Sequence, residues 1–316
     1  MKLIKREFIY NTKGIYDWSG SHAGLPVVDI IDDKVWRIYY SARDNFNHSR
    51  PTYIEVEAGN PANILYEHDN YLLGLGKIGT FDDCGVTVLS LLNHNNKKYM
   101  YYLGWTVRNT VSYHNSLGLA ISTDGGKTFE KFSKGPILSP TYKEPYCNGA
   151  SYTLFDKEEN LFRLYYTSFT GWEVYNGHPE PLYHIKYAES ENGIDWERNQ
   201  IVSVDFKNNQ KGGIARPSVI KENNKLYRMW YTYRKAYDYR TNKKNSYRLG
   251  YAESKDGKVF TRMDNKIGID VSKTGWESIM QTYPHTIKYN DLYWVFYNGN
   301  GFGKTGFGYA VFERED

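Results

Sequence analysis

The sequence predicts an all-β fold built from five similar units, and two repeated patterns support it. A tyrosine-rich strand recurs as WRIYYSARD, KYMYYLGWT, FRLYYTSFTGW, YRMWYTYRK and LYWVFYNGN. Three of these strands are followed by a second repeated segment, LAISTDGG, YAESENG or YAESKDG, in which a strand ends at a Ser-x-Asp/Asn-Gly turn. Period-two alternation and many aromatic and β-branched residues are typical of strands. The matching tyrosines are 62 to 66 residues apart, a repeat length typical of a four-stranded propeller blade.

We therefore expect residues 1–316 to form one domain, a five-bladed β-propeller with four antiparallel strands in each blade. Each repeat should begin with an inner strand and a returning second strand, as in HAGLPVVDIIDDKVWRIYYSARD. The fifth repeat ends after its third strand, GFGYAVF, whereas KLIKREFIYN at the start of the chain has no blade of its own. This N-terminal segment should become the outer strand of the last blade, because an unpaired edge strand would otherwise stay exposed.

Composition excludes several classes of protein. No stretch of 18 apolar residues occurs, and the N-terminus lacks the apolar core of a secretion signal, so we expect a cytoplasmic protein without membrane insertion. The net charge of +4 is spread along the chain, which argues against a nucleic-acid partner. Cys84 and Cys147 are one repeat apart and are expected to be structural free thiols. No His/Cys spacing typical of zinc is present, so we expect no zinc site. We expect no metal and no cofactor.

The repeat predicts where a ligand site would form. In such a blade the inner strand starts, and the second strand ends, on the same face. Long segments follow the second strands, WTVRNTVSYHNS, TGWEVYNGHPEPLY and RKAYDYRTNKKNSY, whereas the opposite face has short turns such as NHNNKK. Long loops on one face indicate a binding site there. Inner strands should start near His22, Asp83, Asn148, Arg216 and Gln281, and second strands should end near Arg43, Trp105, Trp172, Arg234 and Asn298.

Each of these side chains also has a purely structural explanation. Most aromatic residues of the repeat are explained by packing between blades. Asp82 and Asp83 could cap a turn, and His22 could be a hydrogen-bonded structural histidine. Arg43, Arg216 and Arg234 need either carboxylate partners or an anionic ligand, because a buried arginine is costly without one.

The motifs resemble a known family over nearly the whole chain. The repeats and blade endings are similar to those of the five-bladed propeller glycoside hydrolases of families 32, 43 and 130. More closely, SHAGLP, RIYYSARD, FDDCGV, IARPSVI, YRMWYTYR and YNGNGFGKTGFGYA resemble bacterial relatives of the N-terminal domain of glucosamine inositolphosphorylceramide transferase. In the glycoside hydrolases, acidic residues from the first three blades act on the glycosidic bond. Asp83 matches the second-blade acid, whereas the first-blade position holds His22 and the third-blade position holds Asn148.

The resemblance implies that Asp83 is a catalytic carboxylate and that Glu144 or Glu277 is the proton donor. His22 or His285 could take the place of the glutamate as proton donor. Asp17 and Asp44 could also supply carboxylates from loops. The expected substrate-binding residues are His22, Arg43, Asp44, Asp82, Trp105, Trp172, Arg216, Arg234, His285, Asn298 and Asn300. We expect a glycoside-active enzyme, a hydrolase, phosphorylase or transferase, acting on an anionic or phosphate-linked sugar in polysaccharide biosynthesis. The alternative is a non-catalytic carbohydrate-binding propeller, and for both the partner is a carbohydrate or sugar phosphate.

Overall fold

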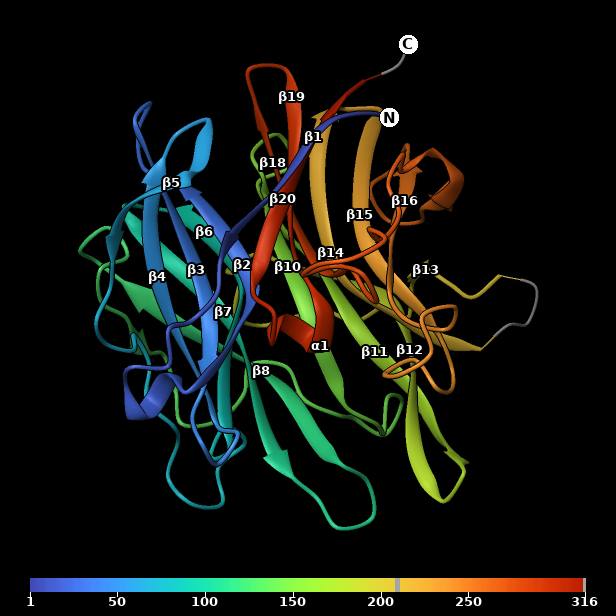
Figure 1. Ribbon diagram of the computed structural model, residues 1–316. Helices are drawn as coiled ribbons and strands as arrows, with labels where there is room; N and C mark the ends of the chain where they lie inside the picture. Colours follow the sequence, from blue (N-terminus) through green and yellow to red (C-terminus); the bar gives the residue numbers. More distant parts are fainter. Residues whose placement is uncertain (208–210, 315–316) are drawn as a thin grey trace.

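The computed structural model describes residues 1–207 and 211–314, and antiparallel strands dominate it (Figure 1). The first group of paired strands is β2 (Ser21–Ile30), β3 (Val35–Arg43), β4 (Ser49–Glu57) and β5 (Asn60–Glu67). The second is β6 (Gly85–His94), β7 (Lys97–Val107), β8 (Tyr113–Ser122) and β9 (Glu130–Lys131). The third is β10 (Asn148–Asp156), β11 (Leu161–Tyr175), β12 (His178–Ser190) and β13 (Val202–Val204).

The fourth group is β14 (Gly212–Asn223), β15 (Leu226–Lys235), β16 (Arg248–Ser254) and β17 (Thr261–Arg262). The last is β18 (Thr282–Tyr289), β19 (Leu292–Asn298), β20 (Phe307–Glu313) and β1 (Lys2–Tyr10). Short helices η1 (Asp17–Ser19), η2 (Asp264–Lys266) and α1 (Asn300–Gly303) lie in connections. The expectation that the N-terminal strand pairs with GFGYAVF is confirmed, because β1 runs antiparallel to β20.

The first strands of the five groups meet around a common centre. Each contacts the next one, from β2 to β6, β10, β14 and β18, and β18 contacts β2 again. The five second-strand tyrosines, which the repeat singled out, are all buried, and aromatic clusters pack between successive groups. Trp36, for example, packs edge-on against Trp294 of the last group at 5.2 Å between ring centroids. Most aromatic residues of the repeat therefore serve packing.

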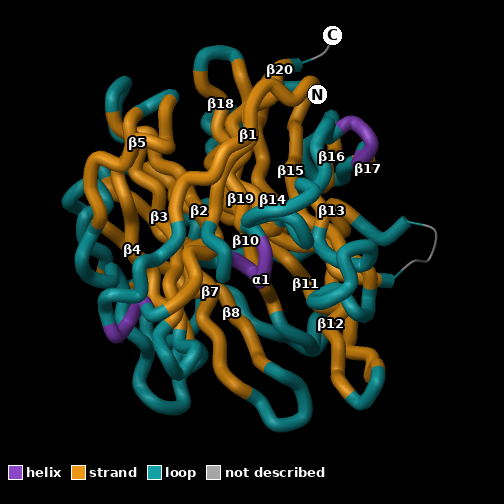
Figure 2. Tube along the Cα trace, viewed as in Figure 1, coloured by secondary structure: helices purple, strands orange, loops and turns teal. Residues whose placement is uncertain are grey.

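One end of the molecule carries the longer connections. The β7–β8 and β11–β12 hairpins project from it (Figure 2). At this end the first strand of a group starts opposite the end of the second, as shown by the pairs Ser21 with Arg43, Gly85 with Trp105 and Thr282 with Asn298.

The first strands are interrupted near this end by irregular pairing. The register shifts between Gly24 and Val27 in β2, between Ala215 and Ser218 in β14, and between Thr282 and His285 in β18. In each shift a residue with positive φ precedes a proline: Leu25 (55°), Arg216 (53°) and Tyr283 (59°). Bulges of this kind redirect a side chain, and a non-glycine residue with positive φ before proline is strained. Such strain is concentrated at functional sites.

Candidate functional site

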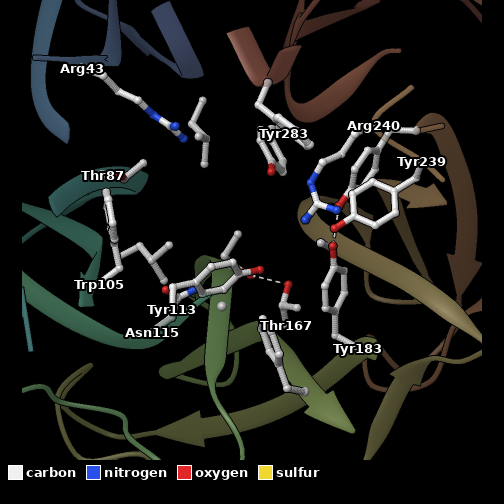
Figure 3. Close-up of a pocket in the computed structure, with 18 of the residues that line it drawn as sticks. Arg43, Thr87, Trp105, Tyr113, Asn115, Thr167, Tyr183, Tyr239, Arg240 and Tyr283 are labelled. Carbon is white, nitrogen blue, oxygen red and sulfur yellow. Dashed lines mark hydrogen bonds between the residues drawn. The ribbon is translucent and has the colours of Figure 1, made fainter. Parts of the chain in front are cut away.

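A cavity of about 300 Å³ lies where the five groups meet (Figure 3). Every group contributes to it. Its lining comprises Leu25, Arg43, Asn47, Thr87, Leu103, Trp105, Tyr113, Asn115, Gly149, Ala150, Thr167, Phe169, Tyr183, Ala215, Tyr239, Arg240, Tyr247, Tyr283 and Phe302. Concave sites of this size with aromatic walls and a few polar groups are typical of small-ligand pockets.

Small side chains contributed by the first strands and by β11 border one side of the cavity. The cavity has space next to Gly149, Ala150 and Ala215 because glycine has no side chain and alanine has only a methyl group. The Thr167 hydroxyl donates a hydrogen bond to the Ala150 carbonyl oxygen at 2.9 Å, which fixes its orientation at the cavity surface. At the strained Leu25, the backbone N–H donates to the Asn298 side-chain oxygen at 2.8 Å. Asn298 therefore does not line the cavity but holds the backbone of the lining residue Leu25.

Tyrosines form one wall, and a buried arginine holds them in place. The Tyr183 and Tyr247 hydroxyls share a short hydrogen bond. Arg234 Nε donates to both, over 3.2 and 3.1 Å, and its guanidinium lies 3.8 Å from the centroid of the Tyr239 ring. Burial raises the pKa of Tyr247 well above its ordinary value, so this hydroxyl stays protonated at neutral pH. The wall consequently presents aromatic faces held by Arg234, and the Tyr247 hydroxyl is neutral.

The charged groups of the lining are two arginines. Arg240 is ion-paired with Glu180, whose other carboxylate oxygen accepts a hydrogen bond from Tyr239 at 2.8 Å. Arg43 Nη1 donates to the Asn47 side-chain oxygen at 2.8 Å, and within residues 1–207 and 211–314 Arg43 has no ion pair with a carboxylate. Loss of surrounding water lowers the pKa of Arg43, although a guanidinium remains charged at neutral pH. In the described part of the chain no aspartate or glutamate lines the cavity.

The acids expected from the sequence lie elsewhere, and three share one arrangement. Asp82 accepts a hydrogen bond from the Tyr102 hydroxyl at 3.2 Å and pairs with Lys131 at 2.6 Å. Glu144 accepts one from Tyr166 at 3.0 Å and pairs with Lys186 and Arg198. Glu277 accepts one from Tyr297 at 2.7 Å and pairs with Arg6 at 3.2 Å. We call each of these tyrosine–carboxylate–cation sets a latch.

The latches explain why the second-strand tyrosines recur. A fourth latch has the same composition, with Asp264 between Tyr231 and Arg262. Burial alone would raise the pKa of Glu144, but the Lys186 ammonium and the Tyr166 hydroxyl outweigh burial and lower that pKa. Glu144 is therefore ionised at neutral pH and holds no proton to donate.

Asp83, the acid that matched the family pattern, is half-buried and does not line the cavity. One of its carboxylate oxygens accepts a hydrogen bond from the Gly79 backbone N–H at 2.9 Å. The other is buried without a hydrogen-bond partner among the described residues. The catalytic roles of Asp83, Glu144 and Glu277 stay predictions, and the structure does not bring these three residues together in the cavity.

Of the other expected residues, the structure places Arg43 and Trp105 in the lining. Arg234 does not line the cavity but donates a hydrogen bond to the Tyr183 hydroxyl of the tyrosine wall. Trp172 packs on Tyr113 at 5.6 Å between ring centroids. His22 Nδ1 lies 2.9 Å from the Ser21 hydroxyl.

The remaining candidates are held by local contacts. Asp44 pairs with Arg50 at 2.9 Å, and the Asn300 side chain accepts a hydrogen bond from the Ile279 backbone N–H at 2.7 Å. Asp17 is exposed in η1. Arg216 and His285 are buried and do not line the cavity.

Several lining residues were missed, although a signal for them existed. Tyr113 and Asn115 lie in WTVRNTVSYHNS, and Tyr239, Arg240 and Tyr247 lie in RKAYDYRTNKKNSY, two of the long loops that pointed to this face. Leu25 and Tyr283 were marked by the X-Pro pairs at the interrupted starts of β2 and β18.

Within the described ranges no group of three or more His, Cys, Asp or Glu side chains lies close enough to hold a metal ion. Cys147 is buried and Cys84 half-buried, and neither forms a disulfide. No helix in the described part of the chain is both long and apolar enough to cross a membrane.

Two relatives match almost the entire chain. Uncharacterized protein MT1551 of Mycobacterium tuberculosis strain CDC 1551 and uncharacterized protein Rv1502 of strain H37Rv are each 34% identical over 306 residues, 97% of this chain and 97% of theirs. The chain belongs to the family of MT1551 and Rv1502. No family model matches it.

Solved structures relate the fold of the MT1551/Rv1502 family to propeller glycoside hydrolases. A structure described as a glycoside hydrolase has a TM-score of 0.72 and 15% identity, covering 99% of this chain and 94% of its own. A thermostable family-43 glycoside hydrolase has a TM-score of 0.66 and 16% identity, with coverage of 97% and 94%. A structure from a study of the GH130 family of mannoside phosphorylases has a TM-score of 0.65 and 14% identity, with coverage of 99% and 95%. At these identities the similarity shows the fold, which agrees with the resemblance to families 43 and 130.

Proposed function

We propose that this protein is a glycoside-active enzyme whose cavity binds an anionic or phosphate-linked sugar. In this proposal residues 1–316 form one domain, and the five strand groups are the blades of a five-bladed propeller. The observation that carries the proposal is the charge of the lining: Arg43 faces an aromatic cavity without an ion-paired carboxylate, and no acidic side chain of the described residues lines it.

The lining suits both parts of such a ligand. Trp105 and the tyrosine wall offer flat apolar surfaces on which the carbon face of a sugar ring packs. Asn115, Thr87 and the tyrosine hydroxyls offer hydrogen bonds to sugar hydroxyls. The Arg43 guanidinium offers charge-assisted hydrogen bonds to a phosphate or carboxylate. A neutral sugar would leave the Arg43 charge uncompensated.

The same charge distribution favours one kind of chemistry. Ordinary glycoside hydrolysis needs two carboxyl groups, about 5 to 9.5 Å apart, on either side of the scissile bond. The lining offers none, whereas a phosphate leaving group departs as an anion that Arg43 would stabilise. We therefore favour transfer of the sugar from a phosphate-linked donor to an acceptor hydroxyl, with the phosphate leaving as the anion, over hydrolysis. The reverse reaction, phosphorolysis, in which inorganic phosphate attacks a glycoside and the acceptor hydroxyl leaves, would use the same Arg43 site. Cytoplasmic polysaccharide biosynthesis and kinship with the glucosamine inositolphosphorylceramide transferase domain remain part of this proposal.

The second candidate is a non-catalytic carbohydrate-binding propeller. The lack of a carboxylate pair in the described lining favours it, because binding needs only the aromatic faces, the hydrogen-bonding groups and Arg43. Turnover decides between the two candidates.

Phosphorus NMR on mixtures of sugar 1-phosphates and nucleotide sugars, with and without acceptor sugars, tests the proposal. We expect the wild-type protein to release phosphate or nucleotide from at least one of them. Arg43→Met should lower that rate at subsaturating substrate by about 10- to 100-fold, the scale of a lost hydrogen bond to a charged group. The matched control Arg314→Met removes the charge of an exposed arginine and should change nothing. Binding without turnover would establish the binding-module alternative, and neither binding nor turnover would refute both.

A further inference from the structure

Arg216 is fully buried on β14 and has no anionic partner in the described part of the chain. Nη1 makes a single long hydrogen bond, 3.4 Å to the Ser151 carbonyl oxygen. Nε and Nη2 have no hydrogen-bond partner among the described residues. From the sequence, the charge of this arginine could be balanced either by a carboxylate of the protein or by an anionic ligand. The described residues place no carboxylate beside it.

A charge in this position is expensive. Arg163, another fully buried arginine, shows the usual solution: it pairs with Asp156 at 3.1 Å and Glu159 at 2.6 Å. A buried guanidinium without a counter-charge or hydrogen bonds costs several kcal/mol. Arg216 also has positive φ at a bulge, so the backbone is strained in placing this side chain on the inner strand.

Further polar atoms without partners lie on the neighbouring inner strands. The Ser151 and Thr153 hydroxyls of β10 and the Thr286 hydroxyl of β18 are buried and have no hydrogen-bond partner among the described residues. β10 and β18 contact β14 from either side. His285 of β18 is close enough for the positive charge of Arg216 to help burial lower its pKa to about 3, so it is neutral at pH 7. Because His285 Nε2 donates to the Val28 carbonyl oxygen at 3.2 Å, its Nδ1 is free to accept a hydrogen bond from water.

We propose that Arg216, together with the hydroxyls of β10 and β18, binds a small inorganic anion of the halide class at the centre of the ring. Nε and Nη2 lie on one edge of the planar guanidinium and can both donate to the same anion. The Ser151 and Thr153 hydroxyls can complete its hydrogen bonds. This site is separate from the sugar cavity: Arg216 does not line that cavity, and its backbone N–H points to Thr167 at the cavity surface. It does not depend on the proposed sugar ligand.

Two measurements test the anion site. Crystals of the full chain soaked in sodium bromide should show an anomalous peak within hydrogen-bond distance of Arg216 Nε or Nη2. In thermal unfolding, raising sodium bromide from well below to about 100 times the dissociation constant should raise the Tm of the wild-type protein by about 5 °C. Arg216→Met should abolish this halide-dependent rise, and it should unfold at or above the wild-type Tm without halide, because methionine needs no counter-charge.

Arg314→Met is the control, because it removes an exposed arginine that belongs to neither site and should keep the full halide response. If Arg216→Met does not fold, the bromide map of the wild-type protein decides alone. A wild-type map without a peak at Arg216, or an equal halide response in Arg216→Met, would overturn the proposal.

Discussion

Buried carboxylates that have cation partners and arginines that have no carboxylate partner occupy different regions of the described structure, and the contrast separates structure from function. In the latches, Asp82, Glu144 and Glu277 each have a tyrosine hydroxyl and a cation within hydrogen-bond distance. Around the centre of the ring, Arg43 and Arg216 have no carboxylate partner in the described ranges. A buried charge that the protein compensates itself is best explained by stability, whereas one left uncompensated indicates a ligand.

The largest effect is expected from breaking a latch. Glu144→Gln keeps the shape but leaves Lys186 and Arg198 without a buried counter-charge, so unfolding in urea should show a loss of about 3–5 kcal/mol. Glu191→Gln, at an exposed position, is the control and should be neutral. Full stability combined with lost turnover in Glu144→Gln would instead support the catalytic role that the family resemblance implies.

A smaller effect is expected from His22, beside the cavity. Burial and the nearby charge of Arg43 lower the pKa of His22 to about 4. Between pH 6.5 and 4 the unfolded chain binds a proton at this residue and the folded protein does not, so stability falls as the pH falls through this window. His22→Gln should reduce the slope of unfolding free energy against pH there. His178→Gln, at an exposed histidine, should leave the slope unchanged; identical slopes for wild type and His22→Gln would refute this assignment.

The smallest effect is expected from Asp83→Asn. Asp83 accepts a backbone hydrogen bond in an exposed turn and does not line the cavity, so we expect a stability loss of about 1 kcal/mol. Turnover separates the two assignments of Asp83: it stays unchanged if the division between latches and cavity holds, and it falls if the catalytic role implied by the family resemblance holds. A fall in turnover of about 100-fold or more, with stability intact, would place Asp83 in the catalytic machinery and contradict the division between latches and cavity.

The sequence predicted the fold better than the site, for physical reasons. The pairing of Lys2–Tyr10 with the last strand could be predicted because the fifth repeat lacks its outer strand, and the repeat pattern alone shows this gap. Glu144 is only four residues before β10 begins at Asn148, yet its carboxylate lies in a latch, because Tyr166 and Lys186 hold it there.

The tyrosine wall could not be singled out by composition. The chain has 31 tyrosines, and those that pack between groups are identical in type to those of the cavity. Only position separates them: Tyr183 and Tyr247 lie on or next to third strands, after the long loops, whereas Tyr102 and Tyr166 lie on second strands. The X-Pro pairs at Leu25 and Tyr283 were the sharpest overlooked signal, because they mark the bulges that place these two residues in the lining.

The central claim is that the cavity selects a negative charge, and calorimetry tests it most directly. A hexose 1-phosphate and its uncharged parent hexose are titrated into the same wild-type protein and into Arg43→Met. We predict that the wild type binds the phosphate at least about 10-fold more tightly than the parent sugar, and that Arg43→Met loses most of this preference. Equal affinity of the wild type for both sugars, or a preference unchanged in Arg43→Met, would contradict the claim.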